Sequence, residues 1–336
     1  MDWFERITGF REGPYEETQS RLSLREGRLS SEVAEREYAV GRLDLLSLEE
    51  LRSRSRDMGS PAPTTFSIVE GDVRQLHSDP AYEGALFQVA SQFNLLEMVG
   101  PDVTPEAGVT RYRHDRTQGP ACAMAAGAGT IYRNYLVPVG GRTGQTARTQ
   151  IDAAADLQRT LAARLDVDPS FLWDMRNGYA LPDRETLRTI GSHLSQAPDA
   201  DIDALRGQLR VGLHSDVEVT EPAAPHGTLV SQVYCSAMPV FYSGIGQVDW
   251  TELASLVLEA AYEATLRAGV LNAARGASNI VLLTRLGGGA FGNDDDWIDA
   301  AILRALRLVA DQGLDVRLVS FDPPSQRLRD LVEAFS

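Results

Sequence analysis

The stretch Asn279-Ile-Val-Leu-Leu-Thr-Arg-Leu-Gly-Gly-Gly-Ala-Phe-Gly-Asn-Asp-Asp-Asp-Trp297 has the pattern of a strand, a glycine-rich loop and the start of a helix. Residues 279–284 are mostly apolar with several β-branched side chains, which is typical of a strand buried on both faces. From Trp297 to Leu306 apolar residues recur at helical spacing. Asp294 to Asp296 stand where the N-cap and first turn of that helix are expected. A strand followed by a helix in this way favours an α/β fold.

The glycine loop, residues 286–293, fits two interpretations. A loop between a buried strand and a helix N-terminus presents bare backbone N–H groups, which can hold a phosphate or diphosphate. Alternatively, the loop is a tight turn that needs glycine for positive φ. Three consecutive glycines and a fourth are more than a turn requires, so we expect a phosphate cradle, although the following aspartates would repel a phosphate unless they point away. The expected ligand-binding residues here are Gly287, Gly288, Gly289, Ala290, Phe291 and Gly292.

The composition excludes several functional classes. The chain has 336 residues and is 43% hydrophobic, enough for one large domain or two ordinary ones. Its net charge of −15 disfavours sequence-independent binding to nucleic acid, so nucleic acid is not an expected partner. All 32 basic residues are arginine, which excludes a Schiff-base lysine and a Walker-type nucleotide site. Cys122 and Cys235 have no metal-ligand spacing, and we expect both to be small buried residues.

The sequence predicts a cytoplasmic protein without a resident cofactor or metal. The N-terminus, Met1 to Glu5, does not have the pattern of a signal peptide. No apolar run approaches the roughly 20 residues of a membrane span, so no membrane contact is expected. The aspartates at 294–296 are a candidate Mg²⁺ site, but capping of the following helix explains them more simply.

We predict three segments along the chain. Residues 1–60 form a charged N-terminal extension with little periodicity, in which Ser47 and Glu50 have the spacing of a capping box. A main α/β domain covers 64–336 and is interrupted by a mostly helical insertion, 150–215. In a later helix, Glu259 and Glu263 are either a carboxylate pair for acid–base chemistry or, as is more common, part of a solvated helix face.

Two further stretches are candidate ligand contacts. A predicted strand, 86–90, leads into Ser91-Gln-Phe-Asn94, and α/β sheets bind ligands at such strand ends. An ordinary strand exit with helix-capping side chains fits equally well. The small-residue run 117–130 begins with Gln118-Gly-Pro120, a second candidate phosphate cradle at a helix start. A packing face of a buried helix is the alternative, and it explains 123–128 but not 117–119.

The segment 161–187 resembles the helix-turn-helix of phage-repressor-like regulators, through a run from Asn177 to Leu187. The segment 151–215 has seven arginines against ten acidic residues, whereas a DNA reader should be basic. We therefore interpret it as a helical insertion with helix-turn-helix-like packing, not as a DNA-binding unit.

The order of these pieces resembles the macrodomain, the ADP-ribose-binding fold. Three stretches carry the resemblance: Gly71-Asp-Val73 after a strand, Gly288-Gly-Ala-Phe-Gly292 between strand and helix, and Leu318-Val-Ser-Phe-Asp322 as a last strand. The resemblance implies a three-layer α/β/α fold with a mixed sheet. It also implies that Asp72 accepts a hydrogen bond from the adenine amino group, that the glycine loop binds the diphosphate and that Phe291 lies along the ligand.

The chain departs from the macrodomain pattern at the first loop. The family has roughly N-A-A-N followed by a glycine run. In this chain residues 88–91 take the place of N-A-A-N, and Asn94 comes three residues late. Residues 118–121 replace the glycine run, after an insertion. Because that asparagine orients the distal ribose in hydrolytic members, the departure bears on hydrolysis more than on binding. The paired glutamates typical of poly(ADP-ribose) glycohydrolases are not recognised in the sequence. The resemblance covers about half the chain, 64–135 and 228–322.

These observations predict a protein that binds ADP-ribose or an ADP-ribosylated macromolecule and hydrolyses an ADP-ribosyl linkage by a glycohydrolase-type reaction. Such hydrolysis relies on ligand distortion and a positioned water. The predicted catalytic residues are Asn94, Asp115 and Gln118, of which Asp115 alone has the chemistry of a general base. Asp72, Gln92 and Gly119 join the glycine loop as predicted ligand contacts. The alternatives are a non-catalytic ADP-ribose or nucleotide sensor, and a regulator acting through the insertion.

Overall fold

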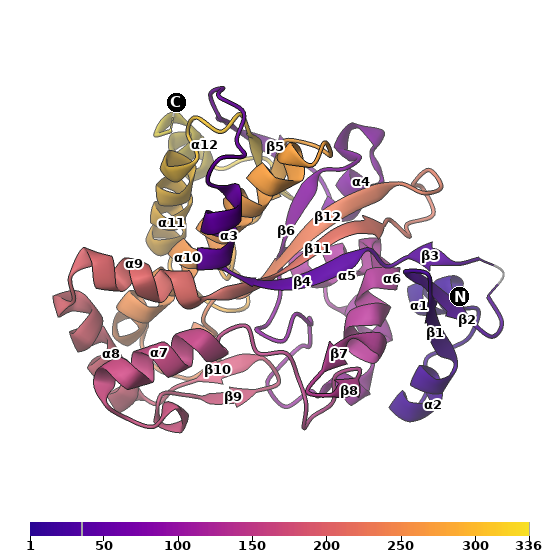
Figure 1. Ribbon diagram of the computed structural model, residues 1–336, viewed down its shortest axis with the longest axis horizontal. Helices are drawn as coiled ribbons and strands as arrows, with labels where there is room; N and C mark the ends of the chain where they lie inside the picture. The colour runs from indigo at the N-terminus through magenta and orange to yellow at the C-terminus, as the bar shows by residue number, and fades with distance from the viewer. Residues whose placement is uncertain (35, 336) are drawn as a thin grey trace.

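The computed structural model describes residues 1–34 and 36–335, and its centre is a seven-stranded mixed sheet in the order β4-β11-β12-β6-β13-β14-β5 (Figure 1). Five neighbouring strands are parallel, and β11 and β4 add to them antiparallel at one edge. The strand bounds are β4 Arg42–Ser47, β11 Arg210–Glu218, β12 Leu229–Cys235, β6 Leu86–Ala90, β13 Ile280–Leu283, β14 Asp315–Ser320 and β5 Thr65–Glu70. The predicted α/β class with a mixed sheet is confirmed.

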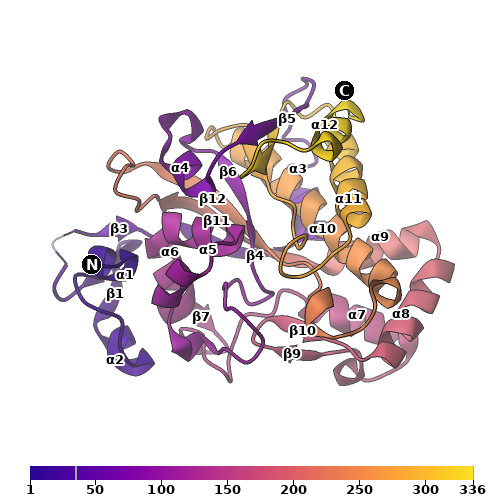
Figure 2. The ribbon, with the colours of Figure 1, turned by 180° about the vertical axis from the view of Figure 1, so that it is seen from behind.

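Helices cover both faces of the sheet, which gives three layers. One face packs against the long helix α10 and its neighbours, and the other against α4 and α5, each face with its own cluster of buried apolar side chains (Figures 1 and 2). The first set is α3 Leu48–Ser55, α10 Gln247–Ala274, α11 Asp295–Leu308 and α12 Gln326–Glu333. The second set is α4 Val73–Ser78, α5 Gln118–Ala125 and α6 Gly127–Ile131, followed by a π-helical turn, Tyr132–Leu136.

Two smaller units flank the layers at opposite sides in Figure 1. The N-terminal unit has a three-stranded sheet and a third apolar cluster built on its aromatic side chains. Its elements are α1 Trp3–Thr8, α2 Tyr15–Ser20, β1 Leu22–Arg25, β2 Arg28–Ser31 and β3 Tyr38–Ala39. The other unit has α7 Ala155–Leu165, β9 Asp174–Arg176, β10 Tyr179–Leu181, α8 Arg184–Gln196 and α9 Asp199–Gln208, and the short hairpin β7 Pro138–Val139 and β8 Arg142–Thr143 lies nearby.

The structure differs from the sequence predictions in where the sheet takes its edge strands. β4 lies inside the predicted extension 1–60, and β11 begins inside the predicted insertion 150–215, yet both belong to the main sheet. The division into domains stays a prediction, but β4 lies wholly within the proposed extension and the proposed boundary at residue 215 cuts through β11. The predicted capping box at Ser47 and Glu50 is present, with both reciprocal hydrogen bonds.

The predicted helix-turn-helix-like packing is wrong. Within the segment that resembles a helix-turn-helix, β9 and β10 form a hairpin around Asn177-Gly178, both of which have positive φ. Asn-Gly with positive φ at both positions is the turn that a two-residue hairpin prefers.

Within the described residues, no helix combines the length and apolar character that crossing a membrane requires.

Candidate ligand-binding site

The carboxyl ends of all five parallel strands meet at two adjoining cavities. The inner cavity, about 290 Å³, is lined by residues that follow β6, β12 and β13. The outer cavity, about 590 Å³, is lined by residues that follow β5, β13 and β14. Asp115, Gln118, Thr284 and Arg285 line both cavities, so the two form one cleft. This is the place where open α/β sheets bind ligands.

The glycine loop offers unpaired backbone N–H groups to the inner cavity. Gly287, Gly289, Ala290 and Phe291 line this cavity, and their N–H groups find no acceptor in the described part of the chain. A Cβ at Gly289 would meet nothing within 4 Å, so the loop is open there. By contrast, Gly288 packs towards Ile298 and its N–H donates to the Arg285 carbonyl. Gly292, whose φ is +70°, packs against Phe241.

The start of α5 forms the facing wall and also leaves N–H groups free. The backbone N–H groups of Gln118 and Gly119 have no acceptor among the described residues, and both residues line the inner cavity. Gly119 must be glycine because a Cβ would clash with the Ala90 carbonyl. Two sets of bare N–H groups around one cavity are suited to the oxygens of a phosphate or diphosphate.

The aspartates that follow the glycine loop have other partners. Asp294 caps α11 by accepting from the Asp296 N–H at 2.8 Å, Asp295 pairs with Arg285 at 2.6 Å, and Asp296 pairs with Arg327 at 2.6 Å. No group of three or more His, Cys, Asp or Glu with the geometry of a metal site occurs among the described residues. Helix capping and ion pairs therefore account for this run.

One carboxylate in the inner cavity has no hydrogen-bond partner. Glu97 is 2% exposed, and neither of its carboxylate oxygens is hydrogen-bonded within residues 1–34 and 36–335. Burial raises the pKa of Glu97 to about 8, although the Arg133 guanidinium, 3.8 Å away, lowers it in part. A buried carboxyl with a raised pKa beside a cavity has the properties of a general acid at neutral pH.

The surroundings of Glu97 fix its position from several elements. Its backbone N–H donates to the Tyr112 hydroxyl at 3.0 Å. Arg133 is fully buried, stacks on the Tyr234 ring and donates to the Leu95 carbonyl at 3.0 Å. An arginine cannot lose its proton in this setting, so it remains a fixed positive charge beside the acid.

Sequence reasoning missed Glu97. It stands alone as an acid in the apolar run 95–99, directly after the polar patch that was singled out. A lone acidic residue in an apolar run is the signal that would have found it.

The predicted contacts are placed as follows. Asp115, Gln118, Gln92 and Gly119 line the inner cavity, and Asp72 lines the outer one. Asn94 does not line either cavity: it is fully buried, donates to Gln150 Oε1 at 2.8 Å and accepts from the Leu96 N–H.

Two of these side chains have limited freedom. The Gln118 amide accepts from the Ala90 N–H at 3.0 Å and donates to the Gln88 carbonyl at 2.7 Å, which ties α5 to the end of β6. Gln92 accepts from the Met98 N–H at 2.8 Å. The Gln118 amide is therefore largely engaged, whereas the Gln92 NH2 group makes no hydrogen bond with the residues that the structure describes.

The β9–β10 hairpin forms one side of the inner cavity. The Phe93 N–H donates to the Gly178 carbonyl at 2.9 Å, and the Tyr179 hydroxyl donates to the Met98 carbonyl at 2.7 Å. The Tyr179 ring lies 5.4 Å from the Phe291 ring and 5.0 Å from the Tyr242 ring, centroid to centroid. The insertion thus contributes Tyr179 to an aromatic wall that also includes Tyr242 and Phe291.

The outer cavity has a polar and an aromatic contact suited to a base. Asp72 Oδ1 accepts from the Arg74 N–H at 2.8 Å as the N-cap of α4, which leaves Oδ2 free of any hydrogen bond in the described part of the chain. Phe321, directly after β14, is 75% exposed and lines the same cavity. An exposed aromatic face beside a carboxylate suits a heterocyclic base with an amino group.

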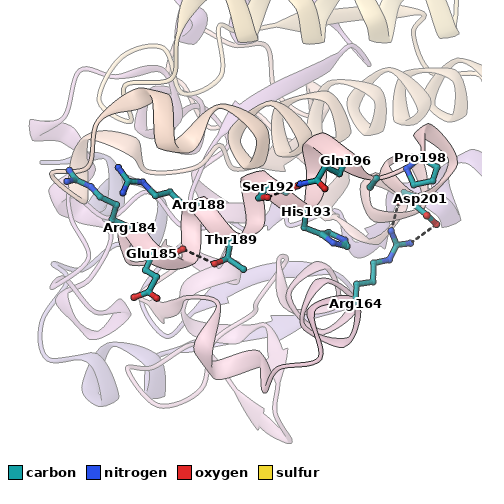
Figure 3. Close-up of a pocket in the computed structure, with 11 residues that line it drawn as sticks. Arg164, Arg184, Glu185, Arg188, Thr189, Ser192, His193, Gln196, Pro198 and Asp201 are labelled. Atoms are coloured by element: carbon teal, nitrogen blue, oxygen red, sulfur yellow. Dashed lines mark hydrogen bonds and ion pairs between the residues drawn. The ribbon is translucent and has the colours of Figure 1, made fainter.

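A wider hollow, about 1160 Å³, lies over the exposed side of α8, away from the strand ends (Figure 3). Its arginines are engaged: Arg184 and Arg188 pair with Asp249, and Arg164 pairs with Asp201. Ser192 and Gln196 hydrogen-bond to each other along the helix. The cleft at the strand ends, with its buried acid and free N–H groups, has the features of a chemical site, which this open hollow lacks.

No protein-family model matches the chain, and no curated protein matches its sequence. Solved structures to which it is similar include the poly(ADP-ribose) glycohydrolase from Thermomonospora curvata, at 15% identity and a TM-score of 0.44, covering 95% of this chain and 94% of that one. Another is that from Deinococcus radiodurans in complex with ADP-ribose, at 11% identity, a TM-score of 0.42 and coverages of 87% and 92%.

A macrodomain from Oceanobacillus iheyensis is also similar, at 14% identity and a TM-score of 0.37, covering 82% of this chain and 93% of that one. These proteins include the family that the sequence motifs resemble. At these values the similarity assigns no chemistry to this chain.

Proposed function

We propose that this protein binds ADP-ribose in the cleft at the strand ends and hydrolyses an ADP-ribosyl bond, with Glu97 as the general acid. The observation that carries the proposal is the buried carboxyl of Glu97, whose oxygens have no hydrogen bond within the described residues, in a cavity whose other walls offer free backbone N–H groups.

The cleft suits each part of the ligand in turn. The adenine lies in the outer cavity, between the exposed Phe321 ring and the free oxygen of Asp72. The diphosphate lies between the glycine loop and the start of α5, where free N–H groups come from both sides. This order leaves the distal ribose in the inner cavity with Glu97. The motif resemblance to macrodomains supports the same assignment.

The reaction needs one proton transfer to the leaving group. The C1″–O bond to the acceptor breaks as the protonated Glu97 carboxyl gives its proton to the leaving oxygen, so the acceptor departs neutral. A water then adds to C1″ and returns a proton to the Glu97 carboxylate, which restores the acid. The raised pKa keeps Glu97 protonated at neutral pH before the reaction, as this role requires.

The test is turnover of an ADP-ribosylated protein by the wild type and by Glu97→Gln. Glutamine keeps the shape of the side chain but has no acidic proton, so we expect a rate loss of about 100-fold or more with ADP-ribose affinity little changed. Glu252→Gln, an exposed site on α10, is the matched control. Equal turnover by wild type and Glu97→Gln would contradict the catalytic part of the proposal.

A binding protein without turnover is the second candidate. It is favoured by the placement of Asn94 outside the cavities and by the engaged amide of Gln118. ADP-ribose binding without turnover of any ADP-ribosylated substrate would select this candidate. An ADP-ribosylated macromolecule as partner, and a cytoplasmic location, stay predictions from the sequence.

A further inference from the structure

Arginine side chains line the rim of the outer cavity, to which the uncharged adenosine is assigned. Arg74, Arg113 and Arg116 line this cavity beyond the Arg285 that it shares with the inner one. An adenosine is uncharged, and the diphosphate is assigned to the N–H groups of the inner region. Neither the adenosine nor the diphosphate therefore explains why these arginines line the outer cavity.

Two of these arginines have close acidic partners, and the other two do not. Arg74 is bound to Glu221 through two hydrogen bonds of 2.5 and 2.8 Å, and Arg285 pairs with Asp295 and Asp299. Arg113 has a 3.4 Å contact with Asp2 and donates to His114 Nε2 at 3.1 Å, and its side chain is 48% exposed. Arg116 makes neither an ion pair nor a hydrogen bond with any residue that the structure describes, although the chain has an excess of acidic groups.

The carboxylates on the same wall do not neutralise Arg116. Asp115 is turned to its own loop, where one oxygen accepts from the Thr117 N–H and hydroxyl at 2.8 and 2.7 Å. Asp72 caps α4, and Asp322 is exposed after β14. A further cavity of about 380 Å³, lined by Asp2 and Arg6, shares Arg74 and Arg113 with the outer cavity.

We propose that Arg116 and Arg113 form a subsite for a phosphate group carried on the adenosine end of the ligand, beyond the diphosphate. Arginine binds phosphate through paired N–H donors, and such charge-assisted bonds are stronger than neutral ones. Two chemical sources supply this group: a phosphate monoester on the adenosine ribose, or the diphosphate of a second ADP-ribose unit attached there. The inference rests on the proposed function, because it takes the adenosine to lie in the outer cavity.

The experiment compares three ligands by calorimetry at low and moderate salt: ADP-ribose, ADP-ribose 2′-phosphate and a dimer of ADP-ribose. We expect at least one extended ligand to bind the wild type about tenfold more tightly than ADP-ribose, by the scale of a charged hydrogen bond. The excess should shrink as salt rises. A gain for the monoester alone identifies the first source, and a gain for the dimer alone identifies the second.

Arg116→Ala should remove most of the excess and leave ADP-ribose affinity nearly unchanged, and Arg113→Ala should remove part of it. Arg111→Ala is the matched control: it lies in the same 3₁₀ turn, Thr110–His114, is exposed and lines neither cavity of the cleft.

Equal affinity of the wild type for all three ligands would overturn the subsite while leaving the proposed function intact. An equal loss of all three ligands in Arg116→Ala would overturn it as well, because Arg116 would then serve the diphosphate. No binding of any of the three ligands by folded wild type would instead reject the proposed function itself.

Discussion

At the scale of a single residue, the buried Glu97 carboxyl lowers the free energy of unfolding at neutral pH. Its pKa of about 8 lies above the ordinary value of 4.5, so the folded state holds a proton that the unfolded chain releases between those pH values. The stability of the protein therefore falls as pH rises through this window, and the full cost is reached near pH 8. A carboxyl retained at such a cost is consistent with a chemical role.

The first prediction follows from that cost. Glu97→Gln should raise the free energy of unfolding at pH 8 by up to about 4 kcal/mol, because the amide pays no ionisation penalty. At pH 4.5 the difference from the wild type should nearly vanish. Urea denaturation at the two pH values measures it, with Glu252→Gln as control. An identical stability change at both pH values would show that Glu97 is not held protonated.

The second prediction concerns Asp72. Asp72→Asn retains an oxygen for the α4 cap but removes the charge that faces the base. We expect ADP-ribose to bind about 1–3 kcal/mol more weakly, whereas ribose 5-phosphate, which has no adenine, should be unaffected. Calorimetry with both ligands measures the difference. A similar loss for both would place Asp72 away from the adenine.

The sequence identified most of the residues around the cleft but not its buried acid, Glu97. Strand ends and glycine loops are local signals, so Asp72, Asp115 and Phe291 could be placed from the chain alone. The burial of Glu97 depends on Tyr112 and Arg133, which arrive from separate segments of the fold. Likewise, the side-chain amide of Asn94 was predicted to face the ligand, and only the packing of residue 150 shows that it is already bound.

At the scale of elements, the parallel strands were predictable and the antiparallel edge was not. A short apolar run such as 280–283 predicts a buried strand. β11 contains the polar run His214-Ser-Asp216 and a register shift there, which interrupts its alternation. The β9–β10 hairpin was missed although Asn177-Gly178 is a strong hairpin signal, because the flanking residues were matched to a helical motif instead.

The third prediction tests the contribution of this hairpin to the site. A Cβ at Gly178, whose φ is +81°, would lie 2.7 Å from Gln92 and Asn94. Gly178→Ala should therefore lower stability by about 2 kcal/mol and weaken ADP-ribose binding by shifting Gln92.

Gly227→Ala provides the comparison for the hairpin variant. Its φ is +80° but a Cβ there would meet nothing within 4 Å, so only the backbone cost of about 1 kcal/mol should appear. Thermal unfolding and calorimetry on both variants separate strain from contact. Equal effects of the two substitutions on stability and on ADP-ribose binding would mean that the hairpin does not fix the position of Gln92 in the site.

At the scale of the whole molecule, a network of ion pairs joins the helical layer to the insertion. Glu263 on α10 is 1% exposed and pairs with Arg52 of α3 and Arg304 of α11, and both arginines also contact Asp203 of α9. The suggested solvated face of α10 is therefore wrong for Glu263, and neither cavity of the cleft is lined by this residue. Glu263 links α10 to α3 and α11 directly, and the shared arginines extend the network to α9.

The fourth prediction is that Glu263→Ala destabilises the protein by about 3 kcal/mol, since it removes the buried carboxylate of the network and leaves Arg52 and Arg304, each 24% exposed, with Asp203 as their remaining counter-charge. Glu259→Ala, one turn away with Arg206 as its partner and 21% of its side chain exposed, should cost about 1 kcal/mol or less. Denaturant unfolding of both variants measures the difference. Comparable small costs would show that the network adds little to the fold.

The central claim is that the cleft between the glycine loop and α5 holds the diphosphate of ADP-ribose. The most direct measurement is calorimetry of ADP-ribose with the wild type, Gly289→Glu and the control Gly246→Glu, two glycines where a Cβ meets nothing within 4 Å. We predict micromolar binding by the wild type and the control, and none by Gly289→Glu, whose carboxylate would occupy the cradle. Undiminished binding by folded Gly289→Glu, or no binding by folded wild type, would contradict the claim.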